Sequence, residues 1–264
     1  MFRSILFAFL FYVVTALMCL FYLPFMVLPR AVFSKITESW MSAMMVIVRI
    51  VPGIRHEIRG AEHRPDGPVI YAAKHQSAWD VIAFKVLVPD CAYVLKRELF
   101  WIPLWGWYVW RCGMIGVDRK GGGATLKIMA KTAVEILKTG RSIVLFPQGT
   151  RTAPGAQRPY LPGVAAIYKS AGVPVVPVAL NSGVFWPRRK FQKYPGTITV
   201  EFLPPIPPGL PRRDFMKTLE DRIEPATARL EAEAQGRAAP PVDNYVENIA
   251  APNATPQNGE KTNC

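Results

Sequence analysis

The chain has 264 residues, half of them hydrophobic, and its 32 basic and 19 acidic side chains give a net charge of +13. This length suits one domain of about 200 residues with terminal appendages and excludes an array of several large domains. The four cysteines show neither metal-ligand spacing nor a framework of pairs, which indicates free thiols in a reducing compartment: Cys19, Cys91, Cys112 and Cys264.

Much of the hydrophobicity lies near the N-terminus. Residues 5–28 are nearly uncharged and long enough to cross a bilayer core. A cleaved signal peptide is the alternative, because Arg3 supplies a basic start, but no small-x-small cleavage site follows. A second apolar stretch, residues 41–51, is too short to span comfortably and is predicted to lie in the interface or to pair with the first helix. Pro24 and Pro29 predict a break between the two.

Basic residues follow the first apolar stretch, which predicts a cytoplasmic globular part: Arg30, Lys35, Arg49, Arg55 and Arg59. Net positive charge alone is typical of a solvated basic surface, and nucleic-acid binding is the alternative that it suggests. The hydrophobic anchor favours anionic lipid instead, because each basic residue near an anionic membrane gains about 1 kcal/mol. The basic run at residues 188–190, after Trp186, suits such a surface. We therefore expect membrane lipid as a partner and no nucleic acid.

Short apolar runs alternate with helix-like stretches along the rest of the chain. The runs predict strands at residues 69–73, 92–95, 114–117, 143–146, 174–179 and 198–202. The intervening periodicity predicts helices at residues 79–87, 124–138 and 164–170. This alternation predicts an α/β fold with a largely parallel central sheet flanked by helices, and a ligand site at the strand ends.

The C-terminal part begins after a proline-rich segment. A charged helix is predicted at residues 212–235, interrupted by Pro225, as a peripheral cover with no chemistry indicated. Later residues are rich in Ala, Pro, Asn and Gln and lack a hydrophobic period, which predicts disorder. The expected organisation is membrane-anchoring helices, a globular domain, a peripheral helix and a tail, at residues 1–52, 53–210, 211–236 and 237–264.

His75 and Asp80 lie in the run Lys-His-Gln-Ser-Ala-Trp-Asp at residues 74–80, between a predicted strand and a predicted helix. A carboxylate there can bond one ring nitrogen of the imidazole, fix its tautomer and leave the other nitrogen free to accept a proton from a hydroxyl. The pair is therefore a candidate general base. Taken alone the spacing is weak evidence, because an ordinary turn histidine gives the same pattern.

In two further segments, a strand-like run is followed by a cation. Residues 146–151, Phe-Pro-Gln-Gly-Thr-Arg, combine a glycine, which lets the backbone approach a ligand closely, with Arg151, whose planar fork suits phosphate oxygens. Residues 113–119, Gly-Met-Ile-Gly-Val-Asp-Arg, end in Arg119. An ordinary turn with a solvated arginine is the alternative for the first of these segments, and pairing of Arg119 with Asp118 for the second.

The order of these motifs, with Val-Pro-Val-Val-Pro-Val at residues 173–178, resembles the glycerophospholipid acyltransferases, most closely the bacterial 1-acyl-sn-glycerol-3-phosphate acyltransferases. The run Lys-Arg-Glu-Leu at residues 96–99 is also similar to that family. The resemblance covers residues 30–210, and four motifs in this order are specific where any one would not be. It implies an acyltransferase domain at residues 53–210, on the cytoplasmic side of a bacterial inner membrane.

The resemblance also implies roles for individual residues. His75 would remove the proton from the sn-2 hydroxyl of a lysophosphatidic acid as that oxygen attacks an acyl thioester of coenzyme A or acyl carrier protein. Asp80 would hold the imidazole, and no cofactor or metal is implied. Ser77 is the covalent alternative, but no nucleophile elbow surrounds it. Three cations would bind the acceptor phosphate and a loop would shape the substrate site: Lys96, Arg119 and Arg151 for the phosphate, and Gln148, Gly149 and Thr150 for the loop.

Two positions depart from the family pattern. Gln148 stands where the family most often has Glu, so it keeps a hydrogen-bonding carbonyl and loses the charge. Lys74 replaces the usual Asn, and a cation beside the base disfavours its protonation unless the side chain points away. Gln148 keeps an alternative open, namely an acyltransferase for another lyso-lipid acceptor such as a lyso-amino-acid lipid. A non-catalytic membrane-binding module is a further alternative.

Overall fold

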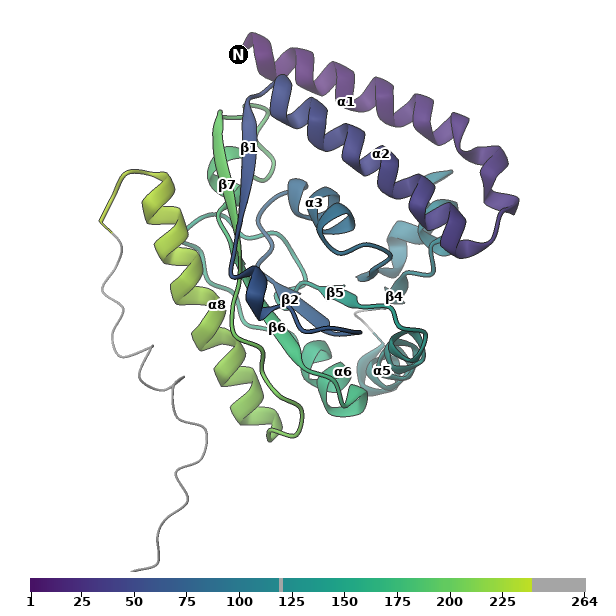
Figure 1. Cartoon of the computed structure of the whole chain (residues 1–264), viewed down its shortest axis with the longest axis vertical. Helices are drawn as coiled ribbons and strands as arrows, with labels where there is room; N and C mark the ends of the chain where they lie inside the picture. Colours follow the sequence, from purple (N-terminus) through teal and green to yellow (C-terminus); the bar gives the residue numbers. More distant parts are fainter. Residues whose placement is uncertain (119–120, 239–264) are drawn as a thin grey trace, which may run out of the picture.

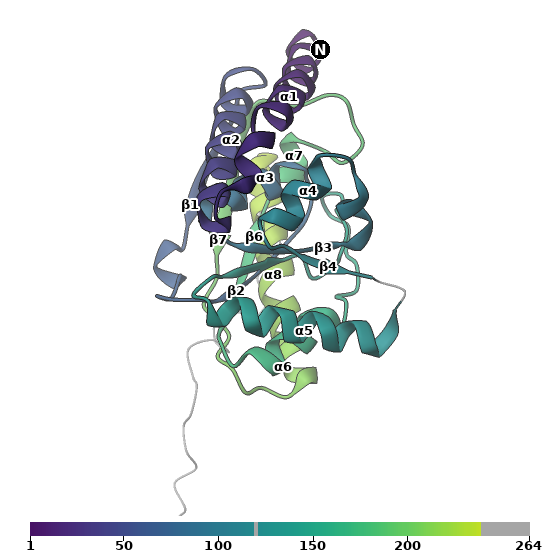
Figure 2. The same ribbon diagram turned by 90° about the vertical axis from the view of Figure 1, so that its right-hand side faces the viewer.

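The computed structural model describes residues 1–118 and 121–238, which form a seven-stranded sheet with helices on both faces (Figures 1 and 2). The strand order is β1-β7-β6-β2-β5-β3-β4, and neighbouring strands are parallel except β6 and β7. The predicted α/β fold with a largely parallel sheet is confirmed. The strands are β1 (Ile54–Arg59), β2 (Ile70–Ala73), β3 (Ala92–Lys96), β4 (Ile115–Val117), β5 (Ile143–Leu145), β6 (Val175–Leu180) and β7 (Gly196–Phe202).

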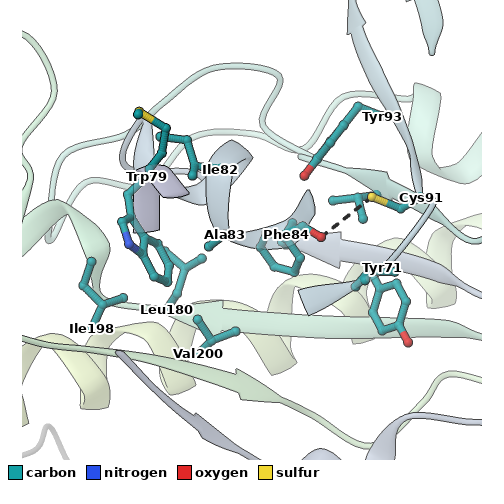
Figure 3. Close-up of a cluster of buried hydrophobic side chains, with 14 of the residues drawn as sticks. Tyr71, Trp79, Ile82, Ala83, Phe84, Cys91, Tyr93, Leu180, Ile198 and Val200 are labelled. Carbon is teal, nitrogen blue, oxygen red and sulfur yellow. Dashed lines mark hydrogen bonds between the residues drawn. The ribbon is translucent and has the colours of Figure 1, made fainter. Parts of the chain in front are cut away.

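Alternate residues of each strand face opposite sides of the sheet, so the sheet separates two cores. On one side, Tyr71 belongs to a cluster with Trp79 and Phe84 (Figure 3). On the other side, Ile70 belongs to a cluster with Phe215. The continuous burial of strands such as β2 and β6 follows from this two-sided cover, and it explains why they read as unbroken apolar runs.

The helices that cover the sheet agree largely with the predicted ones. The helix predicted at residues 79–87 is α3 with the same bounds, and those predicted at residues 124–138 and 164–170 are α5 and α6. The sequence did not predict β1, because this edge strand buries only Ile54 and has no hydrophobic run. The bounds are α3 (Trp79–Leu87), α4 (Trp105–Arg111), α5 (Gly122–Lys138), α6 (Gly163–Ala171) and α7 (Ser182–Phe185).

Two long helices, α1 (Phe2–Phe21) and α2 (Arg30–Ile50), precede the sheet and lie side by side. A 3-10 turn at Leu23–Val27 joins them, as the prolines predicted. The restriction of the second apolar segment to residues 41–51 is wrong, because α2 begins eleven residues earlier, at Arg30. Two of its polar side chains, Ser34 and Thr37, turn toward the protein: both are buried, and Ser34 accepts a hydrogen bond from Lys85 at 2.8 Å.

Both helices are long and apolar enough to cross a membrane, by length and composition. The outer face of α1 carries large apolar side chains that no other described element covers: Phe2, Ile5, Phe9, Tyr12, Leu17, Leu20 and Phe21. A contiguous exposed apolar surface of this kind needs an apolar partner, and a bilayer supplies one along a whole helix. The N-terminal helices therefore suit membrane association.

Removing residues 1–29 is expected to leave a domain that still needs detergent or lipid, because the deletion uncovers the face of α2 that packs against α1. Basic residues would keep a salt-sensitive attachment to anionic vesicles. Vesicle flotation at low and high salt measures both effects. Recovery of the truncated chain as a soluble monomer indifferent to lipid would contradict a two-helix membrane attachment.

The C-terminal helix α8 (Arg212–Ala234) is part of the folded core. It continues through Pro225 without a break and packs along β6, where Phe215, Leu219 and Leu230 are fully buried (Figure 1). The sequence instead predicted an interrupted helix at the periphery, because the segment is rich in charged residues and proline disfavours helix interiors. Tertiary packing overrides that local preference. The tail predicted to be disordered lies, from residue 239, outside the described residues.

Candidate active site

The candidate site residues gather at one edge of the sheet because the strands that precede them are parallel neighbours. His75 follows β2, the loop at residues 148–151 follows β5, and Lys96 ends β3. The carboxyl ends of adjacent parallel strands meet at the same edge, which is where α/β sheets bind ligands. Arg119, the predicted cation after β4, lies outside the described residues.

His75 and Asp80 are in contact. The imidazole Nδ1 lies 2.8 Å from Asp80 Oδ2, and since a carboxylate only accepts, Nδ1 carries the proton and Nε2 is the acceptor. Asp80, fully buried at the start of α3, also accepts hydrogen bonds from the backbone N–H groups of Gln76 and Ser77, at 2.8 and 2.9 Å. Ser182 Oγ donates to its other oxygen at 2.5 Å. These four donors hold the carboxylate, and through it the ring, in one orientation.

The imidazole is also fixed by its neighbours from β5. Its ring stacks on Phe146 with centroids 4.0 Å apart and planes 18° apart. Thr152 donates its backbone N–H to the His75 carbonyl at 2.8 Å and its hydroxyl to the same carbonyl at 3.1 Å. The loop after β2 is therefore tied to the loop after β5, so that both move as one unit.

A cavity of about 690 Å³ opens beside His75. Its lining includes predicted residues from the neighbouring strand ends: Lys96, Gly149, Thr150 and Arg151. Gly149 has φ of +63°, a conformation that L side chains disfavour, so glycine is needed to turn the loop toward the cavity. Side chains from the N-terminal helices also line the cavity, and all but Thr15 are apolar: Phe11 and Thr15 of α1, and Trp40, Met41 and Met44 of α2.

Gln148 and Ser77 do not line this cavity, and neither does Asp80. Gln148 is buried, its Oε1 accepts a hydrogen bond from Thr152 at 3.3 Å, and its Nε2 donates to Glu224 at 3.3 Å. Ser77 is fully buried, and its hydroxyl accepts the backbone N–H of Trp79 at 3.1 Å. Gln148 therefore contacts the protein interior, and Ser77 lacks the access that a nucleophile needs.

Helix α8 supplies two carboxylates behind the site. Glu224 Oε2 lies 2.5 Å from the ammonium of Lys74, which is buried and points away from the imidazole. Glu224 Oε1 accepts hydrogen bonds from Tyr160 at 2.8 Å and from Gln148. The two positions that depart from the family pattern therefore share one partner, a residue 150 positions from Lys74. The loss of charge at Gln148 is matched by a carboxylate from α8.

The second carboxylate, Glu231, links the two loops from behind. Gln76 Nε2 donates to its Oε1 at 2.5 Å, and the backbone N–H of Gly155 donates to its Oε2 at 2.7 Å. Gln76 in turn accepts the backbone N–H of Gly183 at 3.0 Å. Gln76, the residue after His75, is thereby joined to the β5 loop through Glu231 and to α7 through Gly183.

Glu231→Gln gives a pH-dependent prediction. Burial is the main cause that raises the pKa of Glu231 above 4.5, against the lowering effect of its hydrogen bonds and of Lys74. The folded protein therefore binds this proton more tightly than the unfolded chain, and the wild type gains stability relative to E231Q as pH falls through the raised pKa. The gain is at most about 1.4 kcal/mol per pH unit and ends once pH is below 4.5.

Denaturant melts at several pH values measure this difference. Glu220→Gln is the matched control, because Glu220 lies exposed on the same helix and should show no such trend. An E231Q variant whose stability relative to the wild type is the same at pH 7 and pH 5 would show that Glu231 carries no shifted proton.

Sequence reasoning missed four residues that the fold brings to the site: Ser182, Arg188, Glu224 and Glu231. Arg188 lines the cavity and donates Nη1 to the backbone carbonyl of Arg151 at 2.7 Å. The only available signal was its basic run after Trp186, which we assigned to a membrane surface. Among residues 1–118 and 121–238, no group of three or more His, Cys, Asp or Glu side chains is placed to hold a metal ion.

A histidine oriented by a buried carboxylate, beside cations and an apolar cavity, is an arrangement suited to acyl transfer. The comparisons agree on this class. The family model Acyltransferase matches residues 55–181, just under half of this chain.

The names of curated relatives are more specific than the name of the family model. The chain is 37% identical over 171 residues to a 1-acyl-sn-glycerol-3-phosphate acyltransferase of Pseudomonas aeruginosa, a match that covers 65% of this chain and 66% of that protein. It is 32% identical over 183 residues to the human 1-acyl-sn-glycerol-3-phosphate acyltransferase alpha, covering 68% and 65%. The chain thus spans about two thirds of the length of these curated relatives.

A solved structure has the same fold. The 1-acyl-sn-glycerophosphate acyltransferase of Thermotoga maritima superposes with a TM-score of 0.69, covering 90% of this chain and 99% of that one, at 24% identity. At this identity the likeness concerns the fold, and it extends beyond the acyltransferase model to most of the chain.

Proposed function

We propose that this protein transfers a fatty acyl group from an acyl thioester to the sn-2 hydroxyl of 1-acyl-glycerol-3-phosphate, giving phosphatidic acid. The observation that carries the proposal is the 2.8 Å contact between His75 and a buried Asp80 at the mouth of a cavity that also holds Arg151. The names of the curated relatives support the same reaction.

The chemistry follows from the geometry of the pair. Nε2 of His75 takes the proton of the acceptor hydroxyl while its oxygen attacks the thioester carbonyl. The C–S bond then breaks, and the imidazolium returns the proton to the departing thiolate. Asp80 fixes the ring and stabilises the imidazolium cation. General-base catalysis of this kind contributes about 10²–10⁴-fold.

The apolar part of the cavity suits an acyl chain. Its walls at Phe11, Trp40 and Met44 come from α1 and α2, the helices that suit membrane association. A chain could enter this space from the bilayer without crossing water, which would otherwise cost about 0.8 kcal/mol per methylene group. We propose that the membrane is the inner membrane of a bacterium, with the sheet on its cytoplasmic side.

Lysophosphatidic acid is favoured over an acceptor without phosphate for two reasons. Arg151 and Lys96 line the cavity near His75, and cations there suit a phosphate. Arg119 is the third proposed cation on the grounds of its motif. Gln148, the reason for considering a lyso-amino-acid lipid, bonds to Glu224 and Thr152 and does not line the cavity.

The direct test is a thiol-release assay with purified protein in detergent. Each donor, acyl coenzyme A or acyl carrier protein, is paired with lysophosphatidic acid, a lyso-amino-acid lipid or no acceptor. Turnover that depends on lysophosphatidic acid supports the proposal. Vesicle binding without thiol release would instead indicate a non-catalytic membrane-binding module.

Arg151→Ala is expected to raise the KM for lysophosphatidic acid by about 10- to 100-fold, because one charge-assisted contact to phosphate is lost. The KM for the acyl donor should stay within about twofold. Arg213→Ala is the control, since Arg213 is exposed and does not line the cavity. A rise confined to the donor KM would assign Arg151 to the thioester site.

A further inference from the structure

Arg188 lies on the same wall of the cavity as Arg151 but comes from a different part of the fold. It follows α7, two residues after Trp186, whose ring packs edge-on against Phe7 and Phe11 of α1 at 5.0 and 5.9 Å. These contacts fix the short segment that carries Arg188. The backbone that carries Arg188 is therefore anchored by buried aromatic packing, even though the residue belongs to a basic run.

The two arginines lie together without a carboxylate. Neither Arg151 nor Arg188 forms a salt bridge to an acidic side chain in residues 1–118 and 121–238. Partial burial and the neighbouring cations of Arg189, Arg151 and Arg158 lower the pKa of Arg188, which is a sign of uncompensated positive charge. An anion between the two guanidinium groups would relieve this repulsion.

The hydrogen bonds of Arg188 are also incomplete. Nη1 donates to the Arg151 carbonyl, whereas Nε is buried and has no partner among the described residues. A buried donor without an acceptor is costly and needs an explanation. With Nη1 engaged, the Nε and Nη2 edge is the part of the guanidinium whose two donors match two oxygens of a phosphate.

We propose that Arg188 is a phosphate-binding residue that, with Arg151, holds the phosphate of the acceptor from two sides. This inference rests on the proposed function and names a residue outside the matched acyltransferase model, which ends at residue 181. Its bond to the Arg151 carbonyl ties its guanidinium to the backbone that carries Arg151. The phosphate is thereby placed against the same loop that is tied to His75 by Thr152.

Steady-state kinetics of Arg188→Gln in the full chain test the proposal. The KM for lysophosphatidic acid should rise by about 10- to 100-fold, while the KM of the acyl donor stays within about twofold. Arg188→Lys keeps the charge and one donor but loses the fork, so its KM should lie between those of the wild type and R188Q. Lys190→Gln is the matched control, because Lys190 is exposed, lies in the same basic run and does not line the cavity.

Two results would overturn the assignment. If Arg188 only supports the Arg151 loop, R188K should behave as wild type, and R188Q should slow donor hydrolysis without acceptor as much as it slows acyl transfer. If Arg188 contacts phosphates of the donor, its substitution should raise the donor KM alone. Either pattern removes Arg188 from the acceptor site.

A binding measurement separates this inference from the proposed reaction. Addition of sn-glycerol 3-phosphate should raise the Tm of the wild type and of K190Q but not that of R188Q. If the wild type fails to acylate lysophosphatidic acid yet shows this Tm shift, the proposed acceptor is wrong and the phosphate site stands. If the wild type shows no shift, or R188Q shifts as much as the wild type, the phosphate site is wrong.

Discussion

His75→Ala is expected to lower kcat by about 10²–10⁴-fold with the fold intact. The imidazole lines the cavity, so its removal enlarges an existing cavity and does not open a new one in the packed core. The substitution removes Nε2, the atom that takes the proton. This atom acts only after the hydroxyl of the lipid substrate is bound. KM values should therefore change far less than kcat.

Single-turnover acyl transfer, with folding checked by circular dichroism, measures this effect. His56→Ala is the control, because His56 lies on the exposed edge strand β1. An effect on kcat below tenfold in folded H75A would falsify the general-base role. Asp80→Asn should damage activity nearly as much and stability more, because the amide NH₂ would face one of the N–H or O–H donors that Asp80 accepts.

Glu224→Gln is expected to give the largest loss of stability, about 3–5 kcal/mol, because it leaves the buried ammonium of Lys74 without its charge partner. The side chain keeps its size and one acceptor, so packing around Tyr160 is largely preserved. The loops that carry His75 and Arg151 should loosen together, because Glu224 contacts residues from both.

A double-mutant cycle isolates the charge pair from the rest. Lys74→Asn combined with Glu224→Gln removes both charges and should be more stable than E224Q alone. The free energy of unfolding from denaturant melts gives the coupling, and Glu220→Gln on the exposed face of α8 serves as the control. Additive effects of the two substitutions would mean that Lys74 and Glu224 do not act as a pair.

The contacts of Glu224 behind the site also explain why a neutral glutamine suits position 148. A carboxylate at this position would lie within about 3.3 Å of the Glu224 carboxylate in a buried place, where like charges repel strongly. A glutamine there can donate to Glu224 and accept from Thr152 at once. Gln148 is thus explained by Glu224 of α8 and does not require a different lipid substrate.

The sequence by itself determined the features that depend on residues close together in the chain. The apolar runs predicted six strands, since strands covered on both sides consist of continuous hydrophobic residues. The pairing of His75 with Asp80 was also predictable, because a strand-to-helix turn of five residues can bring the two side chains together and the accompanying motifs favoured that reading. The same holds for Arg151 and Gly149, which follow β5 directly.

Only the tertiary structure decided what lies behind and beside these residues. Glu224 lies 150 positions from Lys74 and 76 from Gln148, and Arg188 lies 37 from Arg151, so no spacing in the chain relates them. Their contacts exist because α8 packs along β6 and because the aromatic residues around Trp186 dock on α1. A charged helix reads as solvent-exposed in the sequence, since the buried partners that neutralise its carboxylates become neighbours only when the sheet has formed.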